Sequence, residues 1–211
     1  SSLQILRKLG AALAAGCSMI VKPAALTPLS ALEIGAFFSE AGLPDGVLQV
    51  VTSSRASRVS DALMSDPRVR VVSFTGSTEV GKVLMREGAA TMKRVSLELG
   101  GHAPFIVFED ADLDHAVEQL IAVKMRNMGQ TCVSANRVYV QRSIADKFTR
   151  RIADRMGALR IGDGSSAGTE VGPLIDDSAV EKVHSHVADA VAAGAQLVVG
   201  GRRPESAALA K

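Results

Sequence analysis

A regular alternation of short, β-branched runs with longer amphipathic stretches constrains the fold of this chain more than any other feature. Apolar residues recur at helical spacing in residues 3–15, 30–41, 58–64, 77–90, 112–128, 144–159 and 179–193, and short extended runs lie at 18–22, 47–51, 69–74, 94–97, 105–108, 138–141 and 197–199. Strands separated by helices form βαβ units, because a parallel neighbour needs a crossover connection. The alternation therefore predicts an α/β fold, with parallel sheets and helices on both faces.

The pair Gly100-Gly101 lies between two predicted strands, and we expect a domain boundary there. Residues 1–99 would form one α/β part and residues 100–211 the next. A chain of 211 residues, 47% of them hydrophobic, is long enough for two small domains with cores of their own.

Charge and cysteine content argue against several classes of protein. The formal net charge is +2 and the basic residues are spread along the chain, whereas nucleic-acid and membrane-surface binding normally need a clustered basic face. No apolar run approaches the roughly 20 residues that span a bilayer, and the first residues show no signal-peptide pattern. Two widely spaced cysteines, Cys17 and Cys132, give no disulfide framework. We expect a cytoplasmic protein with a small-molecule partner, and neither nucleic acid nor membrane.

The segment 74–81, Phe-Thr-Gly-Ser-Thr-Glu-Val-Gly, lies between a predicted strand and a predicted helix. Such a turn can direct free backbone N–H groups and the positive end of a helix at a phosphate. Gly76 would allow close backbone approach, and Ser77 could donate a hydrogen bond. The segment is neither a G-x-G-x-x-G fingerprint nor a P-loop, so an ordinary turn capped by Ser or Thr is the alternative.

The surroundings of the two cysteines differ. Cys132 follows a predicted helix end in Gly129-Gln130-Thr131-Cys132, where small and polar neighbours favour an exposed thiol. The alternative is a buried cysteine that acts as a small hydrophobe, which fits Cys17 better than Cys132.

Several charged residues are candidates for chemistry or binding. Glu98 lies between two leucines at a strand end, where partial burial would suit a general base; a charge on an edge strand is the alternative. Lys22 could be a surface charge or a ligand-binding cation, and Arg7 and Arg126, taken alone, would be solvated side chains of helices. No metal site is expected, because the neighbouring histidines at 184 and 186 point away from each other on a helix and have no third ligand.

Four segments together resemble the aldehyde dehydrogenase superfamily in their order and spacing. They are Lys22-Pro23 with Thr27-Pro28, the segment 74–81, Leu97-Glu98-Leu99-Gly100-Gly101, and Gly129-Gln130-Thr131-Cys132. The resemblance covers essentially the whole chain. It implies that residues 1–99 are part of a Rossmann-like NAD(P)-binding domain and that residues 100–211 begin the α/β catalytic domain that bears the thiol.

The resemblance also implies a mechanism. The Cys132 thiolate would attack the aldehyde, a hydride would pass to the nicotinamide, and Glu98 would activate the water that hydrolyses the resulting thioester. The Cys132 backbone N–H would contribute to the oxyanion site. The cofactor, NAD or NADP, would be held by Lys22, Gly76, Ser77, Val80 and Leu99.

Within the superfamily the chain is most similar to succinate-semialdehyde dehydrogenases, through residues 7–17, 103–108 and 124–127. In that group the arginines matching Arg7 and Arg126 hold the distal carboxylate of the substrate, a task suited to a planar guanidinium. Ala25 replaces a Glu that binds the ribose hydroxyls in NAD-preferring relatives, so NADP should be accepted, and Arg55 could help. Ser134 replaces a second cysteine, so no local disulfide switch is expected.

The resemblance further implies a fragment of a longer, homo-oligomeric enzyme, lacking N- and C-terminal parts, so we expect the chain alone to be inactive. Two other hypotheses use the same residues. A thiol hydrolase would use Cys132 and Glu98 but would not need Lys22 or the turn at Gly76-Ser77. A non-catalytic folded fragment would leave Cys132 with an ordinary, slowly alkylated thiol.

Overall fold

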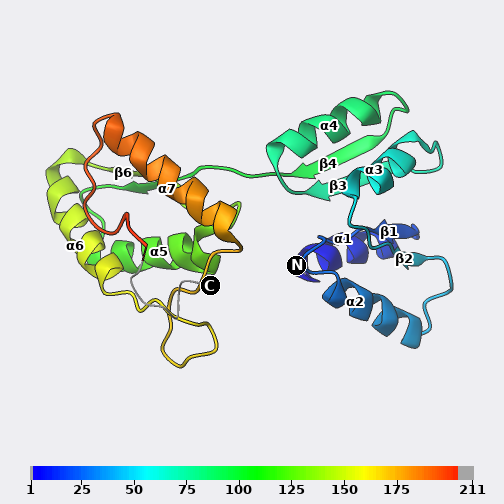
Figure 1. Cartoon of the computed structure of the whole chain (residues 1–211), viewed down its shortest axis with the longest axis horizontal. Coiled ribbons are helices and arrows are strands. Elements are labelled where there is room, and N and C mark those ends of the chain that lie inside the picture. The colour runs from blue at the N-terminus through cyan, green and yellow to red at the C-terminus, as the bar shows by residue number, and fades with distance from the viewer. Residues whose placement is uncertain (1, 204–211) are drawn as a thin grey trace. The chain divides into compact units, whose positions relative to one another are not determined.

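The computed structural model describes residues 2–203, in which helices and strands alternate as an α/β fold (Figure 1). The strands are β1 (Met19–Val21), β2 (Leu48–Val50), β3 (Val71–Thr75), β4 (Arg94–Glu98), β5 (Ala103–Val107) and β6 (Ala135–Val140). The helices are α1 (Ser2–Ala14), α2 (Leu29–Glu40), α3 (Ala56–Ser65), α4 (Thr78–Ala89), α5 (Leu113–Met125), α6 (Ala145–Gly157) and α7 (Asp177–Ala192), with short 3-10 turns η1 (Arg126–Gly129) and η2 (Arg142–Ile144). The chain divides into two compact units, Ser1–Leu99 and Gly100–Lys211.

The six strands pair two by two, and every pair is parallel. β1 pairs with β2, β3 with β4, and β5 with β6, and the intervening helices are α2, α4 and α5. Each pair with its helix is therefore one βαβ unit. The predicted α/β class with parallel strands is confirmed.

The core of the second unit lies between the β5–β6 pair and helices α5 and α6. It consists of the buried side chains Val107, Val117, Leu120, Ala135 and Phe148. In α5 the buried positions Val117, Leu120 and Ile121 follow helical spacing, so one stripe of the helix contributes to this core. The core positions the start of β6, and with it the segment that contains Cys132.

In the first unit, the paired strands β3 and β4 have one partly buried face and one exposed face. Val72, Phe74, Val95 and Leu97 are partly buried, whereas Thr75 and Glu98, which are register partners, lie on the exposed face. Helix α4 lies along this pair (Figure 1) and approaches closely at Gly81, where a Cβ would be 2.8 Å from a Leu99 methyl carbon. Glycine at that position therefore allows the start of α4 to lie close to the end of β4.

Two predicted elements differ from the structure. The helix expected over 112–128 ends at Met125, because Asn127 (φ 50°), Met128 (φ 55°) and Gly129 (φ 78°) adopt left-handed backbone conformations that an α-helix cannot contain. The strand expected at 197–199 is wrong: these residues pair with no other strand in the part of the chain that is described, and all three side chains are exposed. A strand requires a partner for its backbone groups, and hydrophobic sequence alone does not supply one.

Candidate active site

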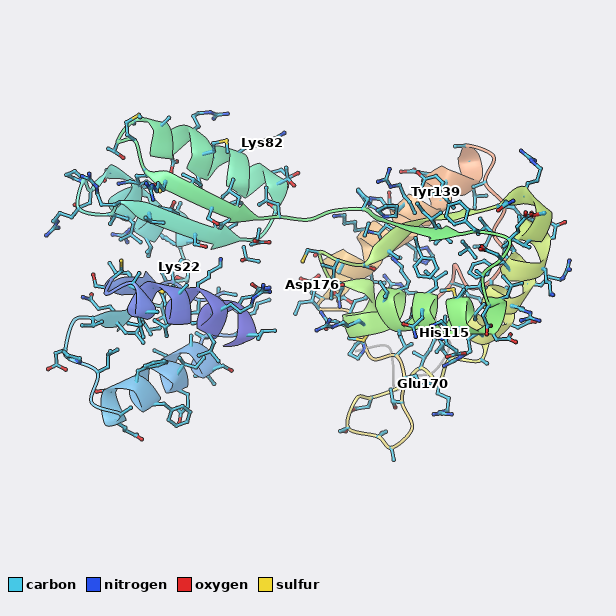
Figure 2. All side chains as sticks on the ribbon, turned by 180° about the vertical axis from the view of Figure 1, so that it is seen from behind. Lys22, Lys82, His115, Tyr139, Glu170 and Asp176 are labelled. Carbon is cyan, nitrogen blue, oxygen red and sulfur yellow. The ribbon has the colours of Figure 1, made fainter. Side chains whose placement is uncertain are left out.

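A hollow lies at the carboxyl ends of the parallel strands β1 and β2, where α/β folds commonly bind ligands. It is lined by Pro23, Ala24, Ala25, Pro28, Thr52, Ser53 and Ser54. Lys22, labelled in Figure 2, directly follows β1, and its Nζ donates to the Pro23 carbonyl oxygen at 2.7 Å. Lys22 therefore adjoins this hollow, whose walls contain Ala25 and two serines and no carboxylate side chain.

The turn after β3 brings its residues to the start of α4. Ser77 is the N-cap of α4, and its Oγ accepts a hydrogen bond from the Val80 N–H at 3.3 Å, as the capped-turn alternative predicts. The Gly76 N–H donates to the Glu98 carbonyl oxygen at 3.1 Å, so this amide is not one of the free N–H groups expected at the turn. A Cβ at Gly76 would lie 2.3 Å from the Phe74 ring, which explains the glycine. Val80 is exposed on the first turn of the helix.

Glu98 ends β4 and is exposed, so the expected partial burial is wrong. Its register partner Thr75 accepts a hydrogen bond from Lys8 Nζ at 2.8 Å. Burial lowers the pKa of Lys8, and the negative charge of Glu98 partly opposes that change. Lys8 thus supplies a positive charge near Glu98. Sequence reasoning missed this residue, because no local pattern links α1 to strands that lie more than 60 positions later.

Cys132 lies in an exposed turn between η1 and β6. The turn is closed by a hydrogen bond from the Ser134 N–H to the Thr131 carbonyl oxygen at 3.2 Å. Among the described residues, neither the Cys132 N–H nor the buried Thr131 hydroxyl oxygen has a hydrogen-bond partner. The Cys132 N–H is therefore available to a ligand, whereas the Thr131 hydroxyl oxygen is buried. Cys17 is exposed as well, so the burial expected for it is wrong.

The two arginines predicted to bind substrate are both exposed. Arg7 lies on α1 of the first unit and Arg126 follows α5 in the second. Neither makes an ion pair or a side-chain hydrogen bond within residues 2–203. Their guanidinium groups are therefore available to an anionic ligand.

The described residues contain no group of three or more His, Cys, Asp or Glu side chains arranged to hold a metal ion. In the same part of the chain, no helix is both long and apolar enough to cross a bilayer.

Comparison with known proteins shows the family to which a chain with these segments belongs. Residues 1–210 match the aldehyde dehydrogenase family, and the chain belongs to that family. It is 55% identical over 201 residues, 95% of its length, to the succinate-semialdehyde dehydrogenase [NADP(+)] GabD of Escherichia coli (strain K12), of which it covers 42%. It is also 55% identical over 95% of its length to a glutarate-semialdehyde dehydrogenase of Pseudomonas aeruginosa, covering 41% of that protein.

A solved structure shows the same fold. The betaine aldehyde dehydrogenase of Staphylococcus aureus in complex with NAD+ matches 99% of this chain with a TM-score of 0.94 at 38% identity, and the chain covers 41% of it. The chain thus spans about two fifths of the length of these relatives.

Proposed function

We propose that the intact protein oxidises an aldehyde with a negative charge at its far end, such as succinate semialdehyde, to the carboxylic acid with NAD(P)+. The observation that carries this proposal is the 55% identity shared with both the succinate- and the glutarate-semialdehyde dehydrogenase. The substrates named for these two relatives carry an aldehyde at one end and a carboxylate at the other. We further propose that the first unit holds the cofactor and that the second presents the thiol.

Cys132 is the proposed nucleophile. Its thiolate would add to the aldehyde carbon, and the Cys132 N–H, which lacks an acceptor among the described residues, would stabilise the negative oxygen that forms. Loss of hydride from that carbon would leave a thioester on Cys132. The exposed position of the thiol supports this role, because an aldehyde can reach it.

Glu98 is the proposed general base of the second half-reaction. Its carboxylate would take a proton from a water molecule that attacks the thioester and releases the acid and the free thiol. Lys8 donates to Thr75 beside Glu98, and its positive charge would attract the Glu98 carboxylate and help to orient it before the proton is transferred.

The dinucleotide would bind at the hollow beside Lys22 and at the start of α4, because the first adjoins a cation and the second is the positive end of a helix. Bound NAD(P)+ would supply the hydride acceptor. Lys22 would hold the adenosine ribose, Gly76 and Ser77 the pyrophosphate at the positive end of α4, and Val80 and Leu99 would lie against the cofactor. Because Ala25 places no carboxylate in the hollow, a 2′-phosphate would not be repelled, which supports acceptance of NADP.

The substrate class can be tested with the exposed arginines. Arg7→Met and Arg126→Met in the intact protein should each raise KM for succinate semialdehyde about 10- to 100-fold, because a charge-assisted hydrogen bond contributes roughly 1.5–3 kcal/mol. KM for an uncharged aldehyde such as propanal should change little. Arg58→Met and Arg150→Met, which alter exposed arginines in the same two units, are the matched controls. Equal effects on both aldehydes would refute the carboxylate-binding role.

Two further measurements separate this proposal from the other hypotheses. Failure of the intact protein to quench the fluorescence of NADH or NADPH would favour a thiol hydrolase. Ordinary slow alkylation of Cys132 at neutral pH would favour a non-catalytic protein. We also propose a homo-oligomer, which light scattering of the intact protein would detect, in a reducing compartment such as the cytoplasm, consistent with two free cysteines.

A further inference from the structure

The Cys132 turn has an exposed tip and a buried base. Cys132 and Val133 are exposed at the tip, whereas Ser134 and Ala135 at the base are only 0% and 4% exposed. On the other side, the turn is preceded by the left-handed residues of η1. The position of the thiol therefore depends on what fixes these two flanks.

Lys124, in the last turn of α5 (green in Figure 1), contacts both flanks. Its Nζ donates to Asn136 Oδ1 in β6 at 2.6 Å and lies 3.5 Å from Ser134 Oγ. The same Nζ would be 3.7 Å from a Cβ placed on Gly129. The Lys124 ammonium group thus lies close to Gly129, before Cys132, and to Ser134 and Asn136, after it. The Lys124 side chain is only partly exposed, and this burial lowers the pKa of its ammonium group.

Asn136 extends this contact to the backbone beside the thiol. Its Nδ2 donates to the Gly101 carbonyl oxygen at 3.2 Å. Gly101 in turn lies against the turn, since a Cβ there would be 3.3 Å from the Cys132 carbonyl oxygen. Only one orientation of the amide serves both bonds, because an ammonium only donates and a carbonyl oxygen only accepts. Lys124, Asn136 and Gly101 therefore form a directed chain of two hydrogen bonds around the Cys132 turn.

We propose that Lys124 and Asn136 are positioning residues that fix the Cys132 turn against Gly101, so that the thiol is held in place for attack. This inference deepens the proposed function and rests on the role of Cys132 as nucleophile. Neither side chain touches the substrate in this proposal. Their effect is on where the sulfur lies and not on how tightly the aldehyde binds.

The test is a double-mutant cycle in the intact protein. Lys124→Met and Asn136→Leu should each lower kcat about 100-fold, because a nucleophile misplaced by about 1 Å costs that much, and KM should change little. The double variant should lose no more than either single variant, since all three break the same chain. Lys124→Arg, which keeps the charge and the donors, should recover most of kcat. Lys147→Met, an exposed lysine of α6, is the control.

Hydrogen exchange of the Ser134 amide, which closes the turn, gives a readout that does not require activity. Exchange should become at least about tenfold faster in Lys124→Met and stay unchanged in Lys147→Met. If Lys124→Met does not fold, Asn136→Asp takes its place, because it keeps the bond to Lys124 and loses only the donor to Gly101. Unchanged kcat and exchange, or strictly additive losses in the cycle, would overturn the proposal. If the wild-type protein oxidises no semialdehyde, the proposed function fails, and faster or unchanged exchange still decides for or against the positioning role.

Discussion

The two free cysteines lie in similar places and are held differently. Both are exposed, and both follow a helix through a glycine with positive φ, Gly16 (70°) before Cys17 and Gly129 (78°) before Cys132. A Cβ at Gly16 would meet nothing within 4 Å, and Ser18, directly after Cys17, is exposed. After Cys132, the exposed Val133 is followed by the fully buried Ser134, and the backbone before Cys132 packs against α5.

Exposure alone does not distinguish a nucleophilic cysteine from one without a catalytic role. The Cys17 thiol lies 3.8 Å from the Ala15 carbonyl oxygen, a local contact that fixes little else. Around Cys132, side chains from α5 and β6 and the backbone before β5 converge on the turn. Catalysis by a thiol requires that the sulfur be held in a reactive geometry, and these contacts, which the Cys17 turn lacks, support the role proposed for Cys132.

The two cysteines should differ most in their effect on activity. In the intact protein, Cys132→Ser should lower kcat/KM for succinate semialdehyde by on the order of 10⁴-fold or more, whereas Cys17→Ser should leave it within about twofold. The formation of reduced nicotinamide, followed by absorbance, measures both. Comparable losses in the two variants would remove the distinction drawn between the turns.

The next effect concerns packing at the base of each turn. Ser134→Leu should lower the free energy of unfolding by about 1–3 kcal/mol, because the side chain at this position is fully buried and a larger one would have to displace its neighbours. Ser18→Leu, at the exposed position after Cys17, should stay within about 0.5 kcal/mol of wild type. Urea unfolding followed by circular dichroism checks both, and a similar cost at both serines would show that the Cys132 turn is not anchored.

The smallest effect separates the two glycines. Gly16→Ala should cost about 1–2 kcal/mol, the ordinary penalty of a side chain in the left-handed region. Gly129→Ala should cost roughly 1 kcal/mol more, because its Cβ would also lie 3.3 Å from the Lys124 carbonyl oxygen. Thermal unfolding of the two variants side by side would reveal the difference, and an equal cost would mean that the backbone before Cys132 can shift as freely as that before Cys17.

The order of helices and strands could be predicted because hydrophobic periodicity is a local property of the sequence. It predicted α5 correctly up to Met125, but not the left-handed residues that follow, since neither Asn127 nor Met128 is a glycine. It failed at 197–199 because a strand depends on a distant partner, which the local sequence does not report.

The candidate site was predictable only in part. Cys132 and Glu98 could be singled out because they occur in short motifs, and their roles stay predictions. The partial burial expected of Glu98 does not follow from its leucine neighbours, because successive residues of a strand point to opposite faces and Glu98 therefore faces away from Leu97. Lys8, Lys124 and Asn136 were missed, because their importance arises from contacts made between separate elements.

The left-handed backbone of Asn127 and Met128 has a consequence for how this chain tolerates genetic variation. Two non-glycine residues in succession adopt φ near +50°, a conformation that β-branched side chains and proline resist. In a saturation library, glycine, asparagine and aspartate should survive selection at these two codons, while valine, isoleucine, threonine and proline should be lost. Positions 127 and 128, just before the Cys132 turn, would thus accept only a few residue types in such a library, although neither side chain is part of the buried core.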